Sequence, residues 1–145
     1  MTSGLFDLTG RTAVVVGGTS GIGHALALGL ADAGADVVVT GRRRDVVDRV
    51  AGEIEARGRR TLRHSADVSD LASLRSLRDA CLAAFQHVDI VVAAAGTTKR
   101  VPTVEMTEHD WGQILDTNLT GMFRTYQVFA PVSYTHLTLP TILRV

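Results

Sequence analysis

The sequence predicts an α/β fold in which helices are wound on both faces of a parallel sheet. Short apolar runs alternate with segments of helical periodicity, which is typical of a parallel sheet with crossover helices. The runs 13–16, 35–40 and 88–93 are almost continuously apolar, as in strands that are buried on both faces. We therefore expect a doubly wound sheet whose strands are joined by helices.

The first strand is expected at 13–16, with a glycine-rich turn after it. The helix that follows begins near Gly21 and ends near Gly34, because glycine tolerates the left-handed backbone found at helix ends. The apolar residues that fall on one stripe of this helix are Ile22, Leu26 and Leu30.

Two further strand–helix pairs are expected to follow. A strand at 35–40 precedes a helix at 44–57, and a short third strand at 61–64 precedes a helix at 69–85 with Ser69 as its cap. The inner faces of these two helices are expected to carry Val46, Val47, Val50 and Ile54, and Leu71, Leu74, Leu77, Leu82 and Phe85, respectively.

The fourth strand is expected at 88–93, followed by a loop through Pro102 and a long helix at 107–129. Thr107 and Asp110 resemble a capping box in which Asp replaces Glu. The predicted sheet is therefore truncated after its fourth strand and the helix that follows.

Composition indicates one soluble globular domain. Of the 145 residues 46% are hydrophobic and 21% charged, which excludes a disordered chain. Lys+Arg and Asp+Glu balance at 15 each, so we expect neither nucleic acid nor a membrane as partner. No apolar run approaches the ~18 residues of a membrane span, and no signal peptide is recognised. With Cys81 as its single cysteine, the chain is expected in the cytoplasm.

Three glycines follow the first strand, spaced as Gly17-x3-Gly21-x-Gly23. Glycine lets the backbone approach a ligand, and the first N–H groups of a helix point toward it with the positive end of the dipole. A P-loop is disfavoured because His24 and Ala25 follow, where Lys-Ser/Thr is needed. The turn indicates a site for an anionic ligand; the alternative is a turn that merely joins strand to helix.

This spacing resembles the TGxxxGxG signature of the short-chain dehydrogenase/reductase family, with Val16 in place of its Thr. The resemblance covers residues 5–131. It implies a Rossmann-like sheet that binds NAD(P), and an oxidoreductase that transfers hydride between nicotinamide and an alcohol or carbonyl substrate. The cofactor-binding residues that it implies in the turn are Gly17, Thr19, Ser20, Gly21, Ile22 and Gly23.

The residues after the second strand bear on the choice of cofactor. An acidic residue there would accept the ribose hydroxyls of NAD, but this chain has Gly41-Arg42-Arg43. A guanidinium group can bind a 2′-phosphate bidentately. We expect NADP, with Arg42 as first contact and Arg43 as second, and keep NAD as the alternative. The competing interpretation is a solvated first helical turn.

The resemblance also assigns residues after the third and fourth strands. Asp67 and Val68 match the family's Asp-Val, in which Asp meets the adenine amino group and Val packs on the ring. The stretch 93–96 reads Ala-Ala-Ala-Gly where the family has Asn-Asn-Ala-Gly, so both amides are missing. Its implied cofactor contacts are Ala94, Ala95 and Gly96.

Asn118 resembles the helix Asn of the family's catalytic tetrad, whose implied role is to hold a water in the proton relay. The tetrad also needs a Ser and a Tyr-x-x-x-Lys, in which Lys lowers the pKa of the Tyr general acid/base. Tyr134 is followed four residues later by Thr138, so we expect this chain to be inactive. The stretch 132–145 opens with VSYTHLTLPT, which resembles a translated sequencing adapter.

We therefore interpret 1–131 as the N-terminal part of an NAD(P)-binding Rossmann domain and 132–145 as a non-native tail. The stretch 97–102 resembles sugar-acid and polyol dehydrogenases of the family, which implies a small-molecule substrate. The intact protein is expected to form a homo-oligomer, a dimer or tetramer. The histidines show no metal-ligand spacing, so no metal is expected. A non-catalytic dinucleotide-binding regulator remains the alternative function, and the arginines argue against a methyltransferase.

Overall fold

β1 lies at the centre of a parallel sheet in the computed structural model, which describes residues 4 and 6–134. In chain order the elements are β1 (Thr12–Val16), α1 (Gly21–Asp32), β2 (Asp36–Thr40), α2 (Arg44–Glu55), α3 (Leu71–Phe85), β3 (Ile90–Ala93), the 3-10 helix η1 (Thr103–Glu105), α4 (Glu108–Leu115), the π-helix η2 (Asp116–Thr120) and α5 (Gly121–Tyr134). Within these residues the strand order is β2-β1-β3, and Val14 pairs with Val38 on one side and Val91 on the other.

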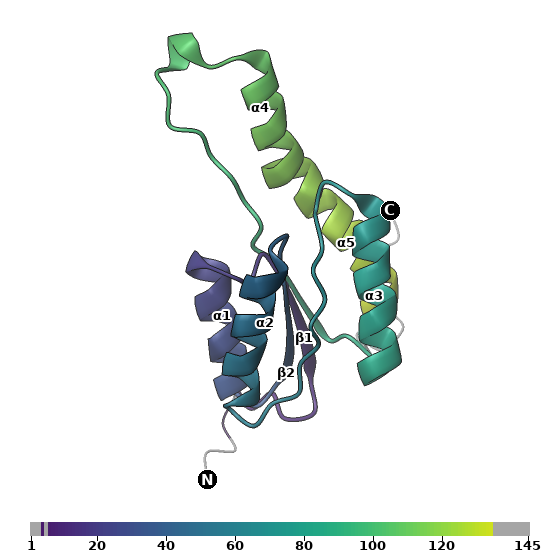
Figure 1. Cartoon of the computed structure of the whole chain (residues 1–145). Coiled ribbons are helices and arrows are strands. Elements are labelled where there is room, and N and C mark those ends of the chain that lie inside the picture. The colour runs from purple at the N-terminus through teal and green to yellow at the C-terminus, as the bar shows by residue number, and fades with distance from the viewer. Residues whose placement is uncertain (1–3, 5, 135–145) are drawn as a thin grey trace.

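Helices cover both faces of this sheet. In Figure 1, α1 and α2 lie on one side of the strands and α3 and α5 on the other. The side chains of β1 alternate between two hydrophobic clusters: Ala13 and Val15 face α1 and α2, while Val14 and Val16 face α3 and α5. All five residues of β1 are buried. The doubly wound α/β fold predicted from the sequence is confirmed.

The third strand predicted at 61–64 is wrong. This segment runs beside β2 but meets it at separate points instead of forming a ladder. Val37 N–H donates to the Arg60 carbonyl at 3.0 Å, and the Thr40 hydroxyl donates to the His64 carbonyl at 2.7 Å. Because a side-chain hydroxyl takes the place of a backbone donor, the regular parallel pattern is interrupted.

The apolar stripe predicted on α1 is not the face that packs on the sheet. Ile22 is 80% exposed and Leu26 is 45% exposed, whereas Leu30 is half-buried. The residues of α1 that are buried against the sheet are Gly23, Ala27 and Ala31. These small residues let the helix approach β1 closely, so size and not hydrophobicity decides which face is buried.

Two helix boundaries differ from expectation. Asp70, and not Ser69, caps α3, because its Oδ1 accepts a hydrogen bond from the Ala72 N–H at 2.9 Å. The helix predicted at 107–129 is interrupted by η2, which divides it into α4 and α5. The capping box at its start is confirmed, with Thr107 and Asp110 each bonding the other's backbone N–H.

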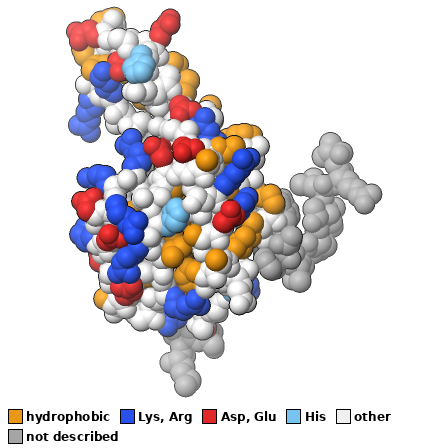
Figure 2. Space-filling model, turned by 45° about the vertical axis from the view of Figure 1, so that its right-hand side comes forward, with side chains coloured by type: hydrophobic (Ala, Val, Ile, Leu, Met, Phe, Trp, Pro, Cys, Tyr) orange, Lys and Arg blue, Asp and Glu red, His pale blue; other side chains and the backbone are white. Residues whose placement is uncertain are grey.

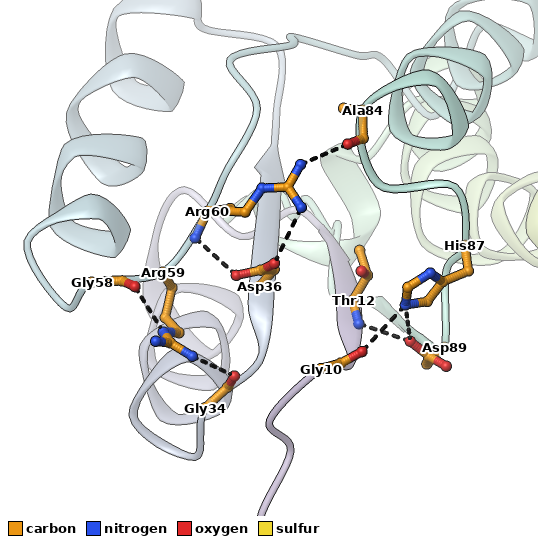
Figure 3. A network of polar contacts seen from close by, with 10 residues as sticks. All are labelled: Gly10, Thr12, Gly34, Asp36, Gly58, Arg59, Arg60, Ala84, His87 and Asp89. Atoms are coloured by element: carbon orange, nitrogen blue, oxygen red, sulfur yellow. Dashed lines mark hydrogen bonds and ion pairs between the residues drawn. The ribbon is translucent and has the colours of Figure 1, made fainter.

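Polar side chains tie the strands together at their amino ends (Figure 3). The Asp36 carboxylate accepts from the Arg60 N–H at 2.9 Å, and the Asp89 carboxylate accepts from the Thr12 N–H at 2.8 Å. Arg60 also donates to the carbonyl of Ala84 at 2.7 Å, at the end of α3. Side chains thus hold this edge of the sheet to the neighbouring loops.

The carboxyl ends of the strands lie at the opposite edge. From there the chain after β3 leaves the sheet, forms η1 and returns through α4; residues 97–120, called the arm below, project beyond the sheet (Figures 1 and 2). In the described part of the chain, no helix has both the length and the apolar character needed to span a membrane. The arm and the strand ends together frame a cleft.

Candidate functional site

A cleft of about 410 Å³ opens at the carboxyl ends of the strands. Open α/β sheets bind ligands at this edge because the loops from several strands converge there. Its lining comes from the end of β1 and the turn after it, the loop between β2 and α2, the loop before α3, the loop after β3, and η2. The lining residues are Val16, Gly17, Thr19, Ser20, Gly41, Arg42, Arg43, Ala66, Asp67, Val68, Ala94, Ala95, Gly96 and Thr117.

The glycine turn is shaped by close backbone packing. Gly17 has a φ of +82°, and a Cβ on it would lie 2.4 Å from the backbone nitrogen of Ala95. A Cβ on Gly23 would lie 2.1 Å from the carbonyl oxygen of Gly17. Neither position has room for a side chain, so both glycines are required for the turn itself. Gly21 has a φ of +55°, which also favours glycine, but open space surrounds it.

The amino end of α1 points at the cleft without a side-chain cap. Ser20 stands at the N-cap position, makes no side-chain hydrogen bond to the helix, and lines the cleft. The first turn of α1 carries no acidic residue that would offset the positive end of the helix dipole. Backbone N–H groups at such an end suit an anion such as a phosphate.

Two arginines border the cleft after β2. Within the described residues, neither the Arg42 nor the Arg43 side chain has an ion pair or hydrogen bond, and both side chains are exposed. Arg44, the next residue, is paired with Asp48 at 3.3 Å. Several other arginines are also engaged: Arg57, Arg60 and Arg63 pair with Asp32, Asp36 and Glu55, and Arg59 donates to the Gly34 carbonyl. Among the described residues outside the cleft, Arg75 and Arg100 likewise show no such bond. The cleft therefore carries two cations whose donors are available to a ligand.

Asp67 and Val68, from the loop before α3, form another part of the cleft wall. The Asp67 Oδ1 accepts from the Ser69 N–H at 2.9 Å, and the Asp67 N–H donates to the Ser73 hydroxyl at 3.1 Å. Val68 is 7% exposed and belongs to the core cluster of α3 and α5. This wall thus combines a carboxylate with an apolar side chain.

Asn118, near the end of the arm, binds the backbone of Thr97 at its beginning. Its Oδ1 accepts from the Thr97 N–H at 2.7 Å, and its Nδ2 donates to the Thr97 carbonyl at 2.9 Å. An amide has further capacity at both atoms, one lone pair on the oxygen and one N–H. The side chain lies in η2, and π-turns inside helices are frequent at functional sites.

Farther out, within the arm, Lys99 in the loop after β3 pairs with Asp110 near the start of α4. Lys99 Nζ lies 2.7 Å from Asp110 Oδ1, and the Thr107 hydroxyl donates to Asp110 Oδ2 at 2.8 Å. These two hydrogen bonds, that of Lys99 first, hold the pKa of Asp110 below its usual value. The loop after β3 is therefore held at two points, Thr97 and Lys99.

Comparison with known proteins identifies the family in which this arrangement occurs. Residues 11–135 match the family model described as short chain dehydrogenase. The chain belongs to the short-chain dehydrogenase family. The strand–glycine turn–helix unit that opens the cleft lies within the matched residues.

Relatives of known sequence and structure agree with this family. The chain is 35% identical over 127 residues to 2-dehydro-3-deoxy-D-gluconate 5-dehydrogenase of Escherichia coli K12, covering 86% of this chain and 49% of that protein. It is 35% identical over 129 residues to gluconate 5-dehydrogenase of Gluconobacter oxydans, covering 87% and 49%. A short-chain type dehydrogenase/reductase from Mycobacterium marinum superposes with a TM-score of 0.84 at 36% identity, covering 88% and 50%. The chain spans about half the length of these relatives.

Most of the residues that the family resemblance implied meet in the cleft. From the predicted set, Gly17, Thr19, Ser20, Arg42, Arg43, Asp67, Val68, Ala94, Ala95 and Gly96 line it. Gly21, Ile22, Gly23 and Asn118 do not. Gly21 adjoins Ser20, Asn118 adjoins Thr117 and Gly23 packs on Gly17, whereas Ile22 is 80% exposed. Thr117 lines the cleft from the π-helix η2 and was missed, since a regular helix was expected there.

Proposed function

We propose that the chain forms the dinucleotide-binding part of an NADP-preferring oxidoreductase that transfers hydride between nicotinamide and an alcohol or carbonyl substrate. The proposal is supported by one observation above all: a cleft that joins an uncapped helix N-terminus to two unpaired arginines. The helix end suits the pyrophosphate, and the arginines suit the 2′-phosphate.

In this proposal Arg42 decides the preference for NADP. Arg42→Asp removes the charge-assisted bonds to the 2′-phosphate, which should weaken NADP binding by roughly 1.5–3 kcal/mol. The new carboxylate can accept the ribose hydroxyls of NAD, so the preference should reverse. Titration calorimetry of the 145-residue chain with NADP and NAD measures both dissociation constants.

Arg75→Asp provides the matched control, since Arg75 is exposed on α3 and is not among the residues that line the cleft. It makes the same change of charge without touching the site and should leave the NADP/NAD ratio as in the native chain. An unchanged ratio in Arg42→Asp would contradict the assignment of the 2′-phosphate to this residue.

The proposed chemistry of the intact enzyme uses Asn118 together with a Ser and a Tyr-x-x-x-Lys. Asn118 would hold a water of the proton relay with the lone pair and N–H that Thr97 leaves available. The 145 residues contain no Tyr-x-x-x-Lys, so we expect the chain to bind cofactor without turnover.

A non-catalytic dinucleotide-binding regulator is the second candidate, favoured by Ala93 and Ala94 in place of the family's amides. Turnover by the full-length gene product would exclude the regulator.

We propose a sugar acid or polyol as the substrate. Two of the relatives reported above are named for gluconate or a gluconate derivative. The stretch 97–102 also resembles sugar-acid and polyol dehydrogenases. Comparing the turnover of gluconate with that of a steroid alcohol by the full-length product tests this substrate class.

For location we propose the cytoplasm, where the buried free thiol of Cys81 would stay reduced. Burial raises the pKa of this thiol to about 12.

We also propose that the intact protein is a dimer or tetramer. α4, η2 and α5 expose a row of large apolar side chains, called the α4–α5 stripe below, and hydrophobic side chains are visible on this projecting part in Figure 2. It consists of Trp111, Leu115, Leu119, Met122, Phe123 and Tyr126. Contiguous apolar surface of this kind marks an interface in soluble proteins.

A further inference from the structure

Arg124 joins two walls of the cleft from the first turns of α5. Its guanidinium Nη1 donates to Asp116 Oδ1 at 2.9 Å and to the Val68 carbonyl at 3.3 Å. Asp116 opens η2, which supplies Thr117 to the cleft, and Val68 lines the cleft itself. The side chain is only 24% exposed. One nitrogen therefore bridges the loop before α3 and the π-turn, two segments distant in sequence.

Packing brings Val68 within reach of Arg124. Gly121 faces Val68, and a Cβ on Gly121 would lie 2.7 Å from Val68 Cγ2. The missing side chain lets Val68 sit against α5, where it is almost fully buried. Its carbonyl is thereby placed where Arg124 can donate to it. The position of Val68 is thus set from α5, by close packing and by a hydrogen bond.

The neighbouring Asp67 is held from the other side. Its N–H and its Oδ1 are bonded to Ser73 and Ser69, at and just before α3. The loop carrying Asp67 and Val68 has no regular strand pairing, because the segment at 61–64 does not form a ladder with β2. Its geometry therefore depends on individual bonds: the backbone bonds from the Ala66 N–H to the Gly41 carbonyl and from the Asp70 N–H to the Asp67 carbonyl, and the side-chain bonds. Among these, Arg124 makes the bond that reaches the loop from α5.

We propose that Arg124 is a positioning residue for the base of the dinucleotide, an inference that rests on the function proposed above. Arg124 never touches the ligand. It fixes the backbone of Val68, and through it the Asp67 carboxylate, at the place where this pair meets the adenine ring and its amino group. Loss of Arg124 should therefore impair recognition of the base while the phosphate contacts of the glycine turn and of Arg42 persist.

The test compares NADP with deamino-NADP, which carries hypoxanthine in place of adenine and lacks the amino group. Calorimetry on the 145-residue chain should give tighter binding of NADP. In Arg124→Gln, NADP binding should weaken about tenfold, equivalent to ~1.4 kcal/mol, while deamino-NADP changes less than about twofold. A general loss of structure would weaken the binding of both nucleotides alike. The ratio of the two dissociation constants therefore distinguishes a positioning role from a general loss of structure.

Three variants complete the design. Arg124→Lys keeps the charge and places three N–H donors on one nitrogen, but lacks the planar guanidinium fork, and should restore part of the preference. Asp116→Asn weakens the same bridge from the side of η2, and it replaces Arg124→Gln in the test if that variant fails to fold. Like Arg124→Gln, it should lower the preference for NADP over deamino-NADP. Arg75→Gln, the matched loss of an arginine charge on α3, should behave as the native chain.

The outcomes separate the two proposals. If the native chain binds neither nucleotide, the proposed function fails and the role of Arg124 fails with it. If it binds both, but Arg124→Gln and Asp116→Asn keep the native ratio or weaken both nucleotides equally, the positioning role is overturned and the proposed function stands.

Discussion

Gly23→Ala tests the close packing of the glycine turn. The added Cβ would lie 2.1 Å from the Gly17 carbonyl oxygen, more than 1 Å inside the 3.4 Å of ordinary contact. Gly17 has no room to retreat on the side where a Cβ would be, because that position already lies 2.4 Å from Ala95 N and 2.6 Å from Ala94 C. α1 must therefore shift away from the sheet, and we expect the upper part of the ~1–3 kcal/mol range for overpacking. With a urea m-value of about 1–3 kcal/mol/M, the midpoint should fall by roughly 1 M.

Gly29→Ala supplies a control on the same helix. A Cβ there meets nothing within 4 Å, so the substitution should stabilise α1 by about 0.5–1 kcal/mol through helix propensity alone. Urea unfolding followed by circular dichroism measures both changes. If Gly23→Ala is as stable as the native chain, or shifts in the same direction as Gly29→Ala, the packing argument for the glycine spacing is refuted.

Three other predictions follow from the site and its surroundings. Ala94→Asn, which restores a family amide, should change the free energy of unfolding by less than about 1 kcal/mol because the side chain can extend into the cleft; a large loss in urea unfolding would contradict this. Since Lys99 lowers the pKa of Asp110, the stability it provides is present above the unfolded carboxylate pKa near ~4 and is lost as pH falls through the folded value; urea midpoints between pH 6 and 3 should fall less steeply in Asp110→Asn, and parallel curves would refute it. Phe123→Glu, in the middle of the α4–α5 stripe, should lower the mass of the assembly formed by the intact protein, measured by size-exclusion chromatography with light scattering, whereas an unchanged mass would remove the stripe as the interface.

The features predictable from the sequence are those that depend on local pattern. Apolar runs located β1, β2 and β3 to within one or two residues, because a strand buried on both faces leaves a continuous signal. The capping box at Thr107 follows from two residues three apart. Glycine spacing together with strand ends brought most of the candidate site to one edge, since carboxyl ends of parallel strands must meet there.

What the sequence could not predict depends on contacts between distant residues. Burial of the Gly23 face of α1 instead of the Leu26 face follows from the space beside β1, which no helical periodicity encodes. The Thr40 hydroxyl bonds the His64 carbonyl only because the fold brings these two distant residues together. Likewise the bidentate bond from Asn118 to Thr97 requires the arm to fold back, and nothing near either residue signals it.

The network at the amino ends of the strands has a consequence for how the domain would accept a ligand. Asp36 and Asp89 bind backbone N–H groups of Arg60 and Thr12, so the order of this edge rests on bonds within the chain. Amide hydrogens there should exchange only when the sheet opens, while those of the cleft loops exchange through smaller local openings. A ligand entering the cleft would then lose conformational entropy only in the loops it touches, against a frame already rigid at its far end.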